Sequence, residues 1–222
     1  MSRDCAVIVF AKAPVPGRVK TRLAATIGEI PAARLAARML DRTLKQAVAS
    51  DIGPVELCCE PDCTHRTFQQ AVKRYGIALN LQVEGDLGIR MHCALARVLL
   101  SHPRALLIGT DCPQLGSEHL RQAASMLRDR PAVFIPSLDG GYVLVGLSAA
   151  IPEIFKDIDW STERVMRQTK AHLDRLGIIS GMLPPLADVD EPDDLTRIPS
   201  TWMTGLTTPA SQRTCMKVWG PR

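Results

Sequence analysis

The chain has 222 residues, of which 46% are hydrophobic, and its formal net charge is +4. This length suits one domain with a sizeable core. No apolar run reaches the roughly 20 residues that a membrane span needs. Lys12 interrupts the apolar start that a signal peptide would need, so we expect a cytoplasmic protein. The basic residues are spread over the chain without interleaved aromatic side chains, so we expect no binding to nucleic acid. We expect no membrane partner either.

A basic loop follows the first predicted strand. Residues 6–10 are an apolar run short enough for one buried strand, and residues 10–23 then contain two prolines, one glycine and four cations. The cations are Lys12, Arg18, Lys20 and Arg22. Neither the phosphate-cradling Gly-x-x-x-x-Gly-Lys motif nor the dinucleotide motif Gly-x-Gly-x-x-Gly is present. Because open α/β sheets bind ligands beyond the carboxyl ends of their strands, we expect this loop to bind phosphate, with a solvated basic loop as the alternative.

Strands and helices alternate along the rest of the chain. Strands are predicted at residues 55–59, 78–83, 104–108, 132–135, 142–147 and 178–183. Helices are predicted at residues 31–50, 64–74, 89–101, 117–128 and 162–176, and a last helix begins near residue 192. This order predicts an α/β fold with a mostly parallel sheet and helices on both faces. The Asp-Gly-Gly turn at residues 139–141 predicts at least one antiparallel strand pair.

The domain is predicted to cover residues 1–198. Residues 199–222 are rich in Thr, Ser and Pro and show no periodicity. We expect a poorly ordered C-terminal tail there, or one that docks only through Trp202 and Trp219.

Two carboxylates are candidate metal ligands. Asp111 follows the predicted strand 104–108 closely, so it lies at the carboxyl edge of the sheet, where it could hold a divalent cation together with phosphates. The alternative is a turn residue. Asp190 is the second candidate. Asp188 and Asp190 both precede the last helix, and either could instead be the N-cap of that helix.

Two further carboxylates lie beside glycines. Asp139 precedes Gly140 and Gly141, which would let a ligand approach the backbone closely, so Asp139 could contact hydroxyl groups or act as a base. Asp86 follows Gly85. For both carboxylates the alternative is a structural role in a turn.

Six motifs occur in order: residues 10–23 (FAKAPVPGRVKTRL), 85–91 (GDLGIRM), 109–113 (GTDCP), 139–142 (DGGY), 160–162 (WST) and 188–190 (DVD). Over about residues 5–198 the chain therefore resembles a bacterial family of GT-A-like transferases. That family is often labelled a domain of unknown function or a radical-SAM/selenodomain-associated transferase, and some members are linked to arsenosugar biosynthesis. The resemblance implies a Rossmann-like GT-A fold, the nucleotide-diphospho-sugar transferase fold, as a three-layer sandwich.

At longer range the chain is similar to nucleotidyltransferases, which pair two aspartates on Mg²⁺. Four departures matter. Pro113 stands where glycosyltransferases of this fold have the second Asp of Asp-x-Asp, and the Gly-x-Gly-x-Arg loop that opens the nucleotidyltransferases is absent, so the reaction type stays open. Ile89 and Glu191 replace an expected polar residue and an expected Thr.

The motifs and the resemblance together predict the site. Asp111 and Asp190 would hold Mg²⁺ or Mn²⁺, and Asp139 and Lys20 are the candidate catalytic residues. The nucleotide or substrate would contact Lys12, Gly17, Arg18, Lys20, Thr21, Arg22, Asp86, Gly140 and Gly141. Lys20, Arg22, Asp111 and Asp190 should line one cleft.

The predicted reaction moves a sugar from a nucleotide-sugar to a small acceptor. The alternative is a nucleotidyltransferase that couples an NTP to a phosphorylated small molecule and releases pyrophosphate. A third alternative is a non-catalytic nucleotide-binding module.

Overall fold

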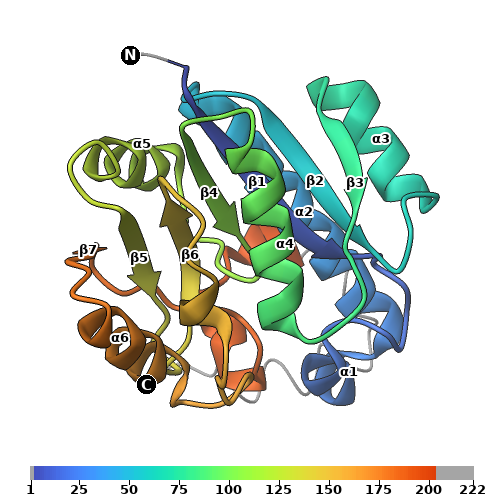
Figure 1. The fold of residues 1–222 in the computed structure, drawn as a ribbon. Helices are drawn as coiled ribbons and strands as arrows, with labels where there is room; N and C mark the ends of the chain where they lie inside the picture. The colour runs from blue at the N-terminus through green and yellow to red at the C-terminus, as the bar shows by residue number, and fades with distance from the viewer. Residues whose placement is uncertain (1–2, 204–222) are drawn as a thin grey trace.

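A seven-stranded sheet forms the centre of the computed structural model, which describes residues 3–203 (Figure 1). The strands are β1 (Cys5–Lys12), β2 (Val55–Glu60), β3 (Ala78–Leu81), β4 (Arg104–Ile108), β5 (Ala132–Pro136), β6 (Tyr142–Leu147) and β7 (Gly181–Met182), in the order β3-β2-β1-β4-β6-β5-β7. Pairs among β1 to β4 are parallel, whereas β6 runs antiparallel to β4 and β5. The predicted mostly parallel sheet with an antiparallel pair is confirmed.

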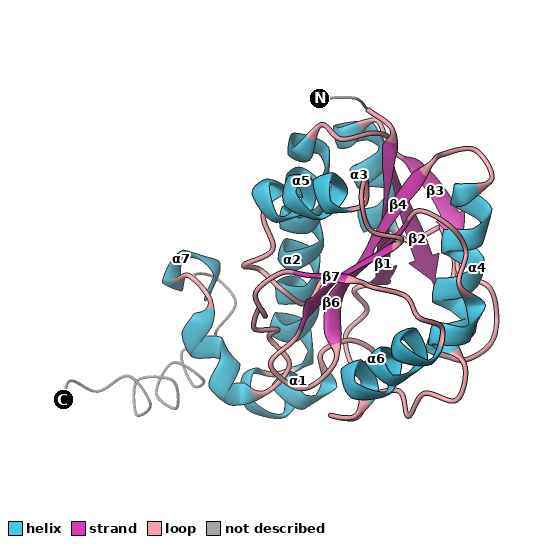
Figure 2. Cartoon of the chain, turned by 60° about the vertical axis from the view of Figure 1, so that its left-hand side comes forward, coloured by secondary structure: helices cyan, strands magenta, loops and turns pink. Residues whose placement is uncertain are grey.

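Helices cover both faces of the sheet (Figure 2). They are α1 (Thr21–Ile27), α2 (Glu29–Ser50), α3 (Arg66–Tyr75), α4 (Leu87–Leu99), α5 (Ser117–Met126), α6 (Val165–Arg175), α7 (Ser200–Met203) and the 3₁₀ helices η1 (Pro152–Phe155) and η2 (Pro192–Arg197). Alternate residues of β1 point to opposite faces: Val7 and Val9 pack under α2, α3 and α5, whereas Ala6 and Ile8 pack under α4 and η1. The fold is a three-layer α/β sandwich.

The basic loop ends in α1, a short helix that the sequence pattern did not predict. Seven residues are too few to form a stable helix alone. Leu23 and Ile27, one turn apart, pack against α2 and against Val189, Leu195 and Ile198. This hydrophobic cluster holds the end of the basic loop next to the segment that carries Asp190.

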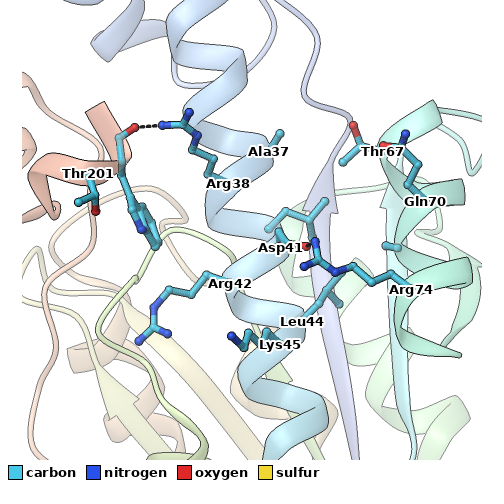
Figure 3. Close-up of a pocket in the computed structure, with 13 residues that line it drawn as sticks. Ala37, Arg38, Asp41, Arg42, Leu44, Lys45, Thr67, Gln70, Arg74 and Thr201 are labelled. Carbon is cyan, nitrogen blue, oxygen red and sulfur yellow. Dashed lines mark hydrogen bonds and ion pairs between the residues drawn. The ribbon is translucent and has the colours of Figure 1, made fainter. Parts of the chain in front are cut away.

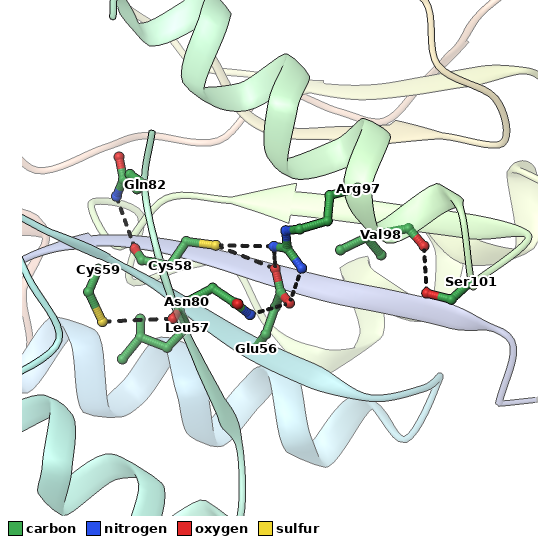
Figure 4. A network of polar contacts seen from close by, with 9 residues as sticks. All are labelled: Glu56, Leu57, Cys58, Cys59, Asn80, Gln82, Arg97, Val98 and Ser101. Atoms are coloured by element: carbon green, nitrogen blue, oxygen red, sulfur yellow. Dashed lines mark hydrogen bonds and ion pairs between the residues drawn. The ribbon is translucent and has the colours of Figure 1, made fainter. Parts of the chain in front are cut away.

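Polar contacts tie the outer helices to their neighbours. On one face, Asp41 of α2 forms an ion pair with Arg74 of α3 at 2.9 Å (Figure 3). On the other face, Glu56 of β2 accepts hydrogen bonds from Arg97 of α4 at 3.0 Å and from Asn80 of β3 at 2.8 Å (Figure 4). The bond from Arg97 holds α4 against β2, and the N-terminal half of α4 faces the cleft described below.

The described chain ends in α7, which falls in the segment predicted as a tail. Trp202 is half-buried and packs against the cluster formed by α1, α2 and η2. The remainder of that predicted tail, including Trp219, lies outside the described residues. Within residues 3–203, no helix is both long enough and apolar enough to cross a membrane.

Candidate active site

A cleft of about 720 Å³ opens beyond the carboxyl ends of β1 and β4. These strands are parallel neighbours on either side of the point where the strand order reverses, which is where open α/β sheets bind ligands. We call it the switch-point cleft. Its charged lining residues are Lys12, Arg18, Lys20, Arg22, Glu60, Arg90, Asp111, Asp139, Asp188 and Asp190.

Lys20 lies at the centre of this charge arrangement. Its Nζ is 2.5 Å from Asp111 Oδ1 and 3.7 Å from Asp190 Oδ1, and it donates a hydrogen bond to the Val189 carbonyl at 2.6 Å. The Lys20 side chain is only 5% exposed. Its backbone is left-handed, with φ 49°, a conformation that is unfavourable for a residue other than glycine. The surrounding contacts therefore hold Lys20 in place against this local cost.

Asp190 keeps its carboxylate available for cations. Asp194 takes the capping role, because its Oδ2 accepts hydrogen bonds from the backbone N–H groups of Asp190 and Glu191 at 3.0 and 2.8 Å. The Asp190 carboxylate instead pairs with Arg22 at 2.9 Å. The interpretation of Asp190 as the helix N-cap is therefore wrong.

Asp111 projects from the loop after β4. Its carboxylate is 56% exposed and pairs with Lys20, and its backbone carbonyl accepts a hydrogen bond from Val189 N–H at 2.8 Å. The loop after β4 and the segment before η2 are thus joined directly. Lys20, Arg22, Asp111 and Asp190 lie in one cleft, as predicted.

Asp139 occupies a tight turn at the edge of the cleft. Its Oδ1 accepts hydrogen bonds from Ser137 Oγ and from Gly141 N–H, the latter at 3.1 Å. The structural role in the turn is therefore present, and it orients the carboxylate along a cleft wall that also includes Ser137 and Gly141.

Gly140 serves the packing of the turn against the segment that leads into α6. Its φ is +93°, and a Cβ there would collide with the Glu163 backbone. Gly140→Ala should therefore destabilise the fold by about 2 kcal/mol or more and lower the melting temperature by about 4–8 °C. Gly76→Ala is the control: Gly76 also has a positive φ but has open space around it, so about 1 kcal/mol is expected. Equal thermal shifts in the two variants would contradict this explanation.

Asp188 is a cleft carboxylate for which the sequence suggested only capping. Burial raises its pKa, with further contributions from the negative charges of Asp139, Asp194 and Asp190. The cleft thus gathers carboxylates whose mutual repulsion a bound cation would relieve. No periodicity or spacing signal in the sequence reveals this burial.

Asp188→Asn should raise the melting temperature at pH 7, by about 2 °C. The raised pKa means that the folded state holds the Asp188 proton more tightly than the unfolded state does. The ionised carboxylate therefore destabilises the fold at neutral pH, and this effect disappears as the pH falls below the ordinary pKa of aspartate. Thermal melts in a chelator at pH 7 and pH 3 test this; an equal gain at both pH values would contradict it.

The other half of the cleft is lined by polar side chains that were not predicted as site residues. Arg90 Nη1 donates to Glu60 Oε2 at 2.8 Å and to Gln82 Oε1 at 3.3 Å. Arg90 Nε and Tyr142 Oη are buried without a hydrogen-bond partner in the part of the chain that the structure describes. Burial raises the pKa of Tyr142. Trp160 completes this wall. Arg90, Tyr142 and Trp160 all lie within the motifs quoted above.

Three predicted binding residues do not line the cleft: Gly17, Asp86 and Gly140. Asp86 caps α4, because its Oδ1 accepts a hydrogen bond from Ile89 N–H at 2.8 Å. Gly17 has φ +76° beside the Glu29 carboxylate and shapes the basic loop. The remaining candidates line the cleft, namely Lys12, Arg18, Lys20, Thr21, Arg22, Asp111, Asp139, Gly141 and Asp190.

Residues 43–162 match the model of a family described as "Uncharacterized protein conserved in bacteria (DUF2064)". The chain belongs to this family. The matched segment of this DUF2064 protein contains Asp111 and Asp139, whereas Lys20, Arg22 and Asp190 lie outside it. Comparison with curated proteins gives no match.

Solved structures resemble this DUF2064 protein along most of its length. A protein of Desulfovibrio desulfuricans G20, described as a "putative nucleotide-diphospho-sugar transferase", is 27% identical over 96% of this chain and 95% of its own, with a TM-score of 0.80. A CMP:2-keto-3-deoxy-manno-octonic acid synthetase in complex with CTP is 11% identical over 90% and 99%, with a TM-score of 0.57. Rv0371c of Mycobacterium tuberculosis H37Rv, in complex with manganese, is 18% identical over 89% and 98%, with a TM-score of 0.51. At these low identities the last two show a shared fold alone, and the predicted fold class is confirmed.

Proposed function

We propose that this DUF2064 protein is a transferase that moves a glycosyl group from a nucleotide-sugar to a small acceptor, assisted by Mg²⁺ or Mn²⁺. One observation carries the proposal: the buried ammonium of Lys20 lies between the carboxylates of Asp111 and Asp190, beside Arg22, in the switch-point cleft. Carboxylates that converge on one cation, next to further cations, suit a metal–diphosphate complex. The domain that carries this function would be residues 1–198.

The residues present fit a divalent cation held partly by the substrate. Within residues 3–203, no group of three or more His, Cys, Asp or Glu side chains is arranged to hold a metal alone. Asp111 and Asp190 would supply two oxygen ligands, and phosphates and water the others, as is common for Mg²⁺. When bound, the metal would neutralise charge on the leaving diphosphate. The manganese complex of Rv0371c, which shares the fold, supports this assignment.

The chain's own residues divide the remaining work. Lys20 and Arg22, with Arg18 and Thr21, would bind the diphosphate through charge-assisted hydrogen bonds. Asp139, oriented by its turn, would contact the sugar or the acceptor and could take the acceptor proton. The similarity to the Desulfovibrio protein, which is described as a nucleotide-diphospho-sugar transferase, supports the choice of a nucleotide-sugar. We also propose that the protein is related to the radical-SAM-associated transferases, some of which are linked to arsenosugar biosynthesis, and that it is cytoplasmic.

The second candidate is nucleotidyl transfer. The CTP complex of the synthetase with the same fold favours it, since a nucleoside triphosphate occupies that related protein. This reaction uses the same cations and metal but needs no base, because the attacking phosphate is already a nucleophile.

Product analysis separates the candidates. The protein would be incubated with Mn²⁺ and a panel of nucleotide-sugars or NTPs in the presence of a mixture of small acceptors. Release of a nucleoside diphosphate supports glycosyl transfer, whereas release of pyrophosphate supports nucleotidyl transfer. Calorimetric binding of a nucleotide without turnover of any donor would instead support the third alternative, a non-catalytic module.

A further inference from the structure

A second hollow lies along the outer flank of α2, where α3 and α7 complete its walls. Its volume is about 640 Å³, a size common for small-molecule sites. On the side between α2 and α7 it is lined by Arg38, Arg42, Lys45, Thr201 and Trp202. We call this side the α2–α7 groove (Figure 3).

Arg42 and Lys45 give the groove positive charge that no ion pair within residues 3–203 neutralises. Arg38, Arg42 and Lys45 are four and three residues apart, so they share one flank of the helix. Figure 3 shows Arg42 and Lys45 reaching to the same side of α2. In the described part of the chain, neither forms an ion pair, since Asp41, the carboxylate that lines the hollow, pairs with Arg74.

Arg42 is oriented for a ligand. Its Nε donates to the Pro113 carbonyl at 2.9 Å, which fixes the guanidinium, while its two terminal nitrogens bond to no residue within 3–203. Such a fork suits bidentate binding of phosphate oxygens. Arg38 Nη1 donates to the Trp202 carbonyl and holds α7 against α2, which places an aromatic side chain in the groove wall.

The sequence that follows α7 offers no carboxylate side chain for these cations. Residues 204–222 contain no Asp or Glu and carry Arg213, Lys217 and Arg222. The limited volume favours a small molecule over a protein partner. We propose that the α2–α7 groove binds a small phosphate-bearing ligand through Arg42 and Lys45, beside Trp202. The site is separate from the switch-point cleft, and the hydrogen bond from Arg42 to the Pro113 carbonyl links it to the loop that carries Asp111.

Fluorescence of Trp202 tests this proposal. The full chain with Trp160→Phe and Trp219→Phe retains Trp202 as its only tryptophan and would be titrated with pyrophosphate without added metal. A saturable change in fluorescence is expected, and Arg42→Gln and Lys45→Gln should each weaken the apparent affinity about tenfold, the loss of one charge-assisted hydrogen bond. An absent change, or an affinity that neither substitution alters, would overturn the proposal.

Two matched controls locate the binding. Lys73→Gln removes an exposed cation of α3 that does not line the hollow, and Arg22→Gln removes a cation of the switch-point cleft. The affinity reported by Trp202 should be unchanged in both. A loss with Arg22→Gln as large as that with Lys45→Gln would place the pyrophosphate in the cleft and overturn the groove as a separate site.

Discussion

Asp111→Asn is expected to lower product formation by about a hundredfold and Mn²⁺ affinity by about tenfold or more. The substitution keeps the shape of the side chain but removes the charge that pairs with Lys20 at 2.5 Å. Asp111 is 56% exposed at the carboxyl end of β4, so the change should affect the cleft rather than the core. The measurements are initial rates with the donor found by product analysis, and Mn²⁺ titration followed by electron paramagnetic resonance.

Asp174→Asn provides the matched control for this prediction. Asp174 is an exposed carboxylate on α6 that pairs with Lys170 at 2.9 Å and does not line the cleft. Rates and Mn²⁺ affinity should match those of the unmodified protein. Full metal-dependent turnover in Asp111→Asn would show that Asp111 is not a metal ligand and would remove the main support for the proposed site.

Apolar patterns predicted the central strands well. Residues 104–108 form β4 as predicted: after Arg104 the strand is wholly apolar, which is typical of a strand buried on both faces. Residues 178–183 yielded only the two-residue β7, and the last predicted helix is the 3₁₀ helix η2. The helix α1 was missed because its stability comes from packing against α2 and against residues more than 160 positions away, and a local pattern contains neither contact.

The meeting of Lys20 and Asp111 could be predicted because parallel strands bring their carboxyl ends to one edge of the sheet, whereas Asp190 was predicted from the family resemblance. The roles of residues that depend on their three-dimensional surroundings could not be predicted from the sequence. Asp86 and Asp139 each lie next to a glycine in the sequence, but their roles differ. Asp86 caps α4 and does not line the cleft, whereas Asp139 lines the cleft.

Lys20→Met is expected to separate two functions that the cleft combines. With Lys20 in place, its ammonium occupies the point between Asp111 and Asp190 at which a divalent cation would be held. Removing it should raise Mn²⁺ affinity in the absence of nucleotide, on the order of tenfold, because Asp111 then loses its ion-pair partner and Asp190 keeps only Arg22. Methionine keeps an unbranched side chain of similar length, so the left-handed backbone at this position is not strained further.

The same variant should bind a nucleoside diphosphate about tenfold or more weakly, because a charge-assisted hydrogen bond to phosphate is lost. For the Mn²⁺ affinity, Lys12→Met is the matched control, since Lys12 also lines the cleft but lies 3.9 Å from Glu60 and forms no ion pair with either aspartate. Calorimetric titrations of Mn²⁺ alone and of the nucleotide alone give the two affinities separately. If Mn²⁺ binds Lys20→Met no more tightly than it binds Lys12→Met, the ammonium and the metal do not compete, and the metal must lie elsewhere than between Asp111 and Asp190.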